Sequence, residues 1–124
     1  MKIIEAIGII DELKPNSYSQ DRKVEWLSAL DSMVQRFVFD KHQGAPETRF
    51  EKYPNDVDPN PKLLVDNHDQ MYIRWLAAQI DLNQGEYVKY NNSIDMFNAE
   101  WDNFEGEYNR THKPLTGGKG RFIY

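Results

Sequence analysis

The sequence predicts an all-α protein: a small bundle of about four helices, with a long proline-rich loop between the second and third helices and an extended C-terminal tail. Apolar residues recur at helical spacing in four separate segments. Four of the six prolines fall within residues 41–61, and three glycines fall within residues 114–124. The 124 residues suit one domain. We divide it into a helical domain at residues 1–113 and a glycine-rich anchoring tail at residues 114–124.

The first predicted helix runs from about Lys2 to Leu13. Pro15 ends it, since the residue before a proline is disfavoured in the helical conformation. Its apolar residues share one face because they lie three or four positions apart: Ile3, Ala6, Ile7, Ile10 and Leu13.

The second predicted helix extends to about Asp40. Ser17, Ser19 and Asp21 each offer a side-chain oxygen as a cap for its first turn. Five apolar residues form the stripe that we expect to pack on the rest of the bundle: Leu27, Leu30, Val34, Phe37 and Val38.

Residues 41–61 are predicted to form a loop, because prolines and turn-forming residues prevent a helix from continuing there. A loop of this length is uncommon inside a compact domain, which favours a functional or partner-contacting segment. We expect a short hairpin between Arg49–Tyr53 and Leu63–Val65.

The third predicted helix starts near Asp66 or Asp69, either of which is a suitable cap, and reaches Leu82. Apolar residues occur on nearly all of its faces, as expected for a central helix that is covered on several sides. Gly85 follows it and suits a left-handed conformation at the helix end.

The fourth predicted helix carries the most regular pattern in the chain. Seven residues follow one another at spacings of three and four, and six of them are aromatic. Two interpretations remain open: the residues pack on the domain's own core, or they form part of a subunit interface, where Tyr and Trp are enriched. We call them the aromatic stripe: Tyr87, Tyr90, Ile94, Phe97, Trp101, Phe104 and Tyr108.

The predicted tail is basic and carries apolar residues at its end. Residues 109–124 contain four basic and no acidic residues, so the net charge of −5 divides into +4 there and −9 over residues 1–108. An extended segment of this composition suits docking on another protein. We expect the docking residues to be Gly117, Gly118, Lys119, Gly120, Arg121, Phe122, Ile123 and Tyr124.

The sequence does not contain the usual arrangements for catalysis or metal binding. It has no cysteine, its three histidines fit no metal-binding motif, and it has no phosphate-binding glycine loop. No apolar run approaches the ~20 residues of a membrane span. The acidic body argues against ordinary DNA binding, which depends on neutralising phosphates. We therefore expect no enzymatic activity, no cofactor, no metal and no membrane contact.

Several short motifs occur in the order and spacing of a known family. The chain resembles the head–tail connector proteins (adaptor or head-completion proteins) of long-tailed bacteriophages over about residues 5–114. The motifs that carry this resemblance are Asp11–Asn16, Trp26–Leu27, Leu63–Val65, Gly85–Tyr87, Tyr90–Asn92, Met96–Asn98 and Tyr108–Arg110.

This resemblance implies a structural virion protein, located in the neck of the virion and assembled in the host cytoplasm. Such connectors form a ring, expected here to have about twelve copies, beneath the portal protein. The ring extends the DNA channel, lets packaged DNA pass without sequence-specific binding, and gives the tail or a stopper protein its attachment platform. The C-terminal segment of related connectors often reaches into the portal, which agrees with the predicted docking tail.

A second hypothesis belongs to a different class of protein. The chain is then a small helical regulatory or inhibitor protein that binds one protein partner through the Tyr/Trp face of its fourth helix.

Overall fold

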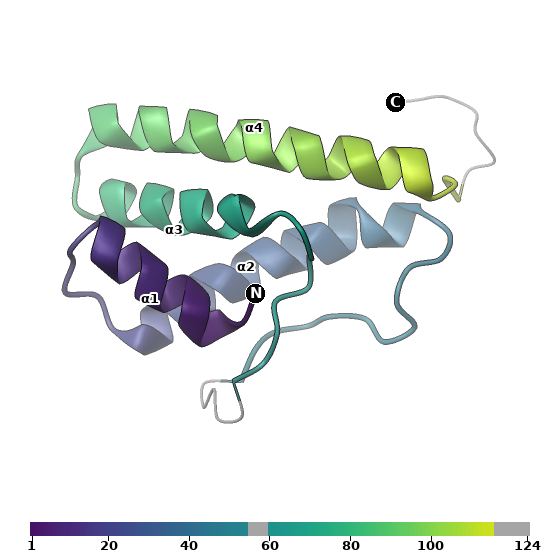
Figure 1. The fold of residues 1–124 in the computed structure, drawn as a ribbon, viewed down its shortest axis with the longest axis horizontal. Coiled ribbons are helices and arrows are strands. Elements are labelled where there is room, and N and C mark those ends of the chain that lie inside the picture. The colour runs from purple at the N-terminus through teal and green to yellow at the C-terminus, as the bar shows by residue number, and fades with distance from the viewer. Residues whose placement is uncertain (55–59, 116–124) are drawn as a thin grey trace.

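The computed structural model describes residues 1–54 and 60–115, which contain four α-helices, one 3-10 helix and no strand (Figure 1). The prediction of an all-α bundle, with a long loop between the second and third helices, is confirmed. The elements are α1 (Ile3–Leu13), α2 (Gln20–Phe37), η1 (Phe39–Lys41), α3 (Asp69–Asn83) and α4 (Tyr87–Thr111).

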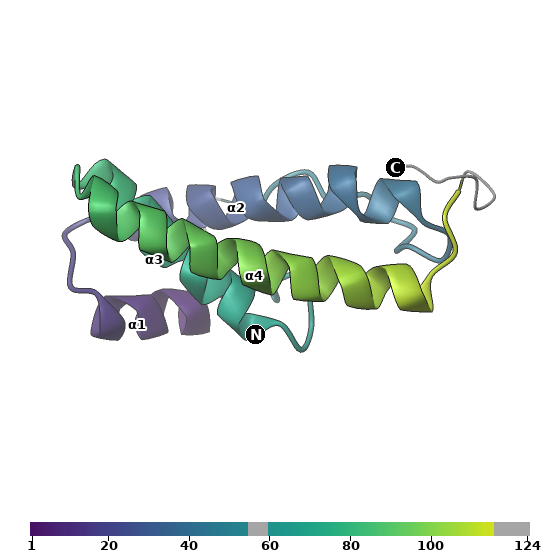
Figure 2. The same ribbon diagram turned by 90° about the horizontal axis from the view of Figure 1, so that it is seen from above.

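Helix α3 is the centre of the bundle and packs against each of the other three α-helices. In Figure 1, α4 lies above α3 while α1 and α2 lie below it; the view from above places α1 and α2 on opposite flanks (Figure 2). Burial of apolar surface drives this assembly. As the apolar pattern predicted, α3 buries side chains on most of its faces: Met71, Tyr72, Ile73, Leu76, Ala78, Ile80 and Asp81.

Helix α4 is the outer helix of the bundle and packs on α3. Among the described residues, no Cα atom of α1, α2 or η1 comes within 8 Å of a Cα atom of α4. Because α4 has 25 residues and α3 has 15, α4 continues past the first turn of α3, toward the end of α2 (Figure 1). Its contact with α2 is therefore made by side chains alone.

Part of the long loop caps the first turn of α1. The amide of Ile3 donates a hydrogen bond to the carbonyl of Pro61 at 3.1 Å, and the amide of Ile4 donates to Oδ1 of Asn60 at 3.0 Å. The first amides of a helix have no partner within the helix. These bonds therefore satisfy α1 and hold the loop beside it.

Two predictions about helix ends are confirmed. Ser19 caps α2, because its hydroxyl accepts a hydrogen bond from the amide of Arg22 at 3.1 Å. Gly85 follows α3 with a φ of +75°, a left-handed conformation that glycine adopts without strain.

The predicted caps of α3 are wrong. The helix begins at Asp69 with His68 in the cap position, and the side chain of His68 makes no cap hydrogen bond. Asp66 lies outside the helix, where its carboxylate pairs with Lys62 at 2.9 Å. Asp66 therefore pairs with a lysine instead of capping α3.

Two apolar residues that were predicted to be buried are exposed. Leu13 is 68% exposed and Phe37 is 48% exposed. Each is the last residue of its helix. Helix α2 also ends at Phe37 rather than Asp40, and the tighter 3-10 turn that follows directs Val38 and Phe39 inward.

The predicted hairpin between residues 49–53 and 63–65 is not formed within the described residues. Its first arm instead lies along α2, whose polar side chains bind the loop backbone. Gln35 accepts a hydrogen bond from the amide of Phe50 at 2.9 Å, and Ser28 accepts one from the amide of Tyr53 at 3.0 Å. These side chains satisfy the amides that a hairpin would have paired.

Phe97 tests how firmly α4 is held on α3. It is 5% exposed, and its ring centroid lies 5.1 Å from that of Trp75. We expect Phe97→Ala to lower the free energy of unfolding by about 3–5 kcal/mol, because truncation leaves a cavity. Urea unfolding followed by circular dichroism measures this loss. Val88→Ala is the control: Val88 is on the same helix but 78% exposed, so the change should stay within about 0.5 kcal/mol. Equal losses in both variants would contradict this packing.

Candidate functional site

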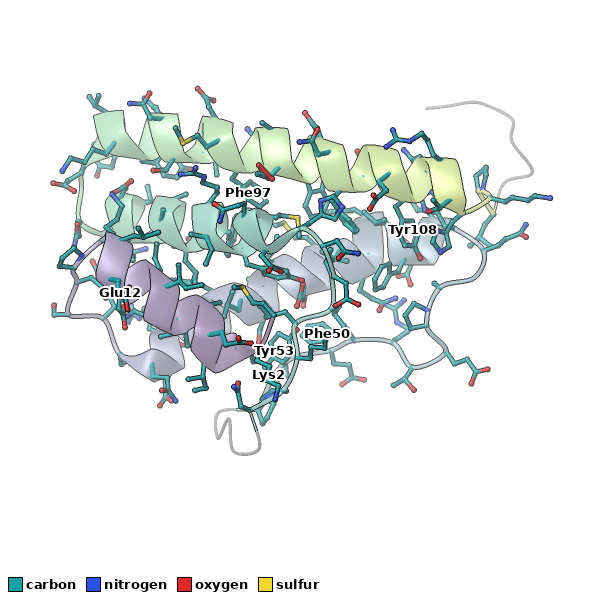
Figure 3. The ribbon with its side chains drawn as sticks, viewed as in Figure 1. Lys2, Glu12, Phe50, Tyr53, Phe97 and Tyr108 are labelled. Atoms are coloured by element: carbon teal, nitrogen blue, oxygen red, sulfur yellow. The ribbon has the colours of Figure 1, made fainter. Side chains whose placement is uncertain are left out.

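Most of the aromatic stripe lies against the chain's own core. Phe97 and Phe104 are buried, whereas Tyr87, in the first turn of α4, is 65% exposed. Figure 3 shows Phe97 on the side of α4 that faces α3, and Tyr108 near the end of α2. The other four members are half-buried: Tyr90, Ile94, Trp101 and Tyr108.

Four rings of the aromatic stripe form a continuous row. Successive centroids from Phe97 through Trp101 and Phe104 to Tyr108 lie 6.1, 5.9 and 6.0 Å apart, within the range of favourable aromatic pairs. Tyr108 also stacks on His112, with centroids 3.8 Å apart and planes 3° from parallel. The row runs along the C-terminal half of α4.

An open groove of about 370 Å³ lies between α2 and α4, beside this row. Phe37 forms one wall, and the guanidinium of Arg36 lies 5.2 Å from its ring centroid. An accessible apolar groove with a few polar groups is a candidate binding site. We call it the α2–α4 groove; its lining residues are Met33, Phe37, Phe97, Asn98, Trp101 and Glu105.

The first residues of the predicted tail are fixed to the body. The amide of Leu115 donates to the carbonyl of Lys41 at 3.0 Å, and the amide of Gln43 donates to the carbonyl of Lys113 at 2.7 Å. Residues 113–115 therefore run antiparallel to residues 41–43. The predicted docking residues, 117–124, lie outside the described residues.

His42 joins the same region to both long helices. Its Nδ1 lies 2.6 Å from the carbonyl oxygen of Val38, and its Nε2 lies 2.6 Å from Oδ1 of Asn109. The end of α4 and the start of the tail are thus held beside the end of α2.

A buried carboxylate connects the long loop to two helices. Asp31, on α2, has no exposed surface. It accepts hydrogen bonds from the hydroxyl of Tyr53, from the hydroxyl of Tyr72 at 2.7 Å and from the amide of Leu64 at 3.2 Å. Tyr72 in turn accepts a hydrogen bond from the amide of Val65 at 2.9 Å. This cluster places both described arms of the loop on the bundle.

Burial controls the electrostatics of this cluster. It raises the pKa of Asp31 from 3.8 to about 6, although the hydrogen bonds from Tyr53 and Tyr72 partly oppose the effect. Burial, together with the nearby carboxylate, raises the pKa of both tyrosines above their ordinary value. Raised pKa values often occur at active sites, but Asp31 has no surface that a substrate reaches. We assign it a structural role.

A second buried carboxylate fixes the opposite end of the bundle. Asp81, on α3, has no exposed surface and lies 2.8 Å from the ammonium of Lys14, just after α1. It also accepts a hydrogen bond from the hydroxyl of Ser93, on α4, at 2.6 Å. One side chain thereby connects three helices.

The structure groups no set of metal ligands: within residues 1–54 and 60–115, no three His, Asp or Glu side chains gather as a metal ion requires. None of the helices in this part of the chain is long and apolar enough to cross a membrane. Comparison of the chain with family models, with curated proteins and with solved structures found no match.

Sequence reasoning missed the Asp31 cluster and the α2–α4 groove. A signal for the cluster was present in the sequence: Ser28, Asp31, Ser32 and Gln35 recur at helical spacing on α2, as a polar face beside the apolar one. The groove had no such signal. It exists because, in the described residues, no Cα atom of α2 lies within 8 Å of a Cα atom of α4, and that separation depends on how the helices pack.

The raised pKa of Asp31 makes stability depend on pH. The folded state binds this proton more tightly than the unfolded state, so the contribution of Asp31 to stability is fully present below about pH 4 and is lost as the pH rises toward about 6. The loss amounts to about 3 kcal/mol, at about 1.4 kcal/mol for each tenfold change in proton affinity. Urea unfolding between pH 4 and pH 7 should therefore show Asp31→Asn gaining stability relative to wild type as the pH rises.

Asp40 provides a control of opposite sign. Hydrogen bonds from Arg49 and Gln35 lower the pKa of Asp40, so its contribution to stability is present at neutral pH and is lost as the pH falls. Asp40→Asn should lose stability relative to wild type as the pH rises to about 4, and should then stay level with it between pH 4 and pH 7, where Asp31 titrates. If both variants followed the same trend, the assignment of Asp31 as the titrating group would be wrong.

Proposed function

We propose that this chain is a structural, non-enzymatic subunit of the neck of a long-tailed bacteriophage, a head–tail connector. About twelve copies form a ring under the portal protein. The ring extends the DNA channel and carries the attachment platform for the tail or a stopper protein. The protein assembles in the host cytoplasm and remains in the virion.

The fixed start of the tail is the observation that carries this proposal. Leu115 and Lys113 are hydrogen-bonded to residues 41–43, so the segment that follows starts from a defined point at one end of a rigid bundle. Its basic and apolar residues, from Lys119 to Tyr124, suit docking on another protein. A rigid body with a docking segment at one end is what attachment to the portal requires.

The opposite end of the bundle supports lateral assembly. The end of α1 and the beginning of α4 lie there, far from the end of α4 (Figures 1 and 2). Leu13 is 68%, Tyr87 65% and Val88 78% exposed. Unlike surfaces at the two ends favour head-to-tail contacts between copies, the type of contact that closes a ring.

The charge distribution supports a passive DNA channel. Residues 1–108 carry a net charge of −9, and an acidic wall repels phosphates rather than binding them. Packaged DNA then passes without sequence-specific contacts.

The α2–α4 groove favours the alternative, a small regulatory or inhibitor protein. Trp101 and the exposed ring of Phe37 form an aromatic surface of the kind that anchors a single protein partner. In this alternative the tail is dispensable and the groove is the site of function.

Deletion of Thr116–Tyr124 distinguishes the two proposals. We expect the deletion to abolish attachment to the portal protein encoded in the same genome, because the docking residues are lost, while the helical circular dichroism stays unchanged. Mass measurement of mixtures with and without the portal protein gives the stoichiometry. A matched control replaces Met96 with Ser; Met96 is 50% exposed and lies outside the tail and the proposed lateral surface, so the change should preserve attachment. A deleted chain that still assembles on the portal would overturn the proposed role of the tail.

A further inference from the structure

The α2–α4 groove is an apolar surface that the body leaves open. Phe37, Met33 and Trp101 line it, and Glu105 is the only charged lining residue. Phe37 is 48% exposed although its position on α2 continues the buried stripe of Leu30 and Val34. The volume of about 370 Å³ lies at the lower end of the range of sites that hold a compact group such as one or two side chains.

The tail starts close to this groove. Leu115 is hydrogen-bonded to Lys41, which follows Phe37 by four residues, through η1. Along α4, Glu105 lies six residues, or about 9 Å of helix, before Thr111. The nine residues after Leu115 span up to about 30 Å when extended. Residues 122–124 can therefore reach the whole groove of the same chain.

The end of the tail complements the groove in polarity and in charge. Phe122, Ile123 and Tyr124 are apolar or aromatic, and Arg121 precedes them directly. The groove offers apolar walls and one carboxylate, with no cationic lining residue. Aromatic rings pack favourably beside Trp and Phe, and an arginine next to a carboxylate forms a charge-assisted hydrogen bond.

We propose that the side chains of the chain's own Phe122 and Tyr124, which share one face of an extended segment, dock in the α2–α4 groove of the free protomer, with Arg121 beside Glu105. The tether favours the same chain over a second copy: a linker of this length gives an effective concentration on the order of millimolar, far above that of free copies in dilute solution. The docking segment is then covered until a partner competes for it. This inference does not depend on the proposed function, because it concerns the free protomer alone.

Competition by a peptide tests the proposal. A fluorescent peptide with the sequence of residues 116–124 should bind the chain truncated after Leu115. It should bind the full chain at least about tenfold more weakly, because the tethered segment already occupies the groove. The Met33 methyl resonance should shift when the truncated chain binds the peptide, and it should have the shifted position in the full chain.

Matched variants assign the binding to the groove. Phe37→Ser should weaken peptide binding to the truncated chain about tenfold or more, since it removes an aromatic wall. Leu13→Ser, at an even more exposed apolar position at the end of α1, should leave it unchanged. A peptide with Ser at 122–124 should not bind. Circular dichroism checks that both protein variants keep their helices.

Three results would overturn the inference. The truncated chain does not bind the peptide; the full and truncated chains bind it equally; or the Met33 shift of the full chain appears only at high protein concentration, which assigns the groove to a second copy. None of these results affects portal attachment, so this inference and the proposed function fail independently.

Discussion

The fold depends on satisfying the carboxylate of Asp31 away from water. A buried carboxyl group is costly unless protein groups replace its hydration. Tyr53, Tyr72 and the amide of Leu64 provide that replacement, and they come from the first loop arm, from α3 and from the second loop arm. The Asp31 cluster therefore holds Tyr53 and Leu64, one from each described arm of the loop, against the bundle. It also sets the register of α2 against α3.

Asp81 is a second buried carboxylate, at the other end of the bundle, and it is paired with Lys14 and hydrogen-bonded by Ser93. Between these two buried carboxylates, α3 is covered by α1, α2 and α4. The C-terminal part of α4 extends past α3 and is supported by its row of rings and by residues 39–43, after the end of α2. The α2–α4 groove lies beside this part of α4, where side chains alone fill the space between the two helices.

A rigid body with a tethered docking segment has a simple energetic consequence. If the segment rests in the groove, a partner that binds the segment must compete with the groove. The apparent affinity of the segment for that partner is then multiplied by the fraction of chains whose segment is free. Such competition keeps apolar residues such as Phe122 and Tyr124 from binding unrelated proteins before the correct partner is present. In the connector function that we propose, this competition keeps the copies separate until they meet their platform.

The sequence by itself determined the four helices, the central position of α3, a side-chain cap for α2 within residues 17–21 and the turn at Gly85, because each depends on local periodicity or on the properties of a few neighbouring residues. Tertiary structure alone decided three other features. The amide of Phe50, in the expected hairpin, donates to Gln35 on the polar face of α2 instead. Phe37 is exposed where α2 ends, and the α2–α4 groove lies between two helices whose backbones stay apart. Each of these depends on which distant segment meets a residue, and a periodic pattern carries no information about such partners.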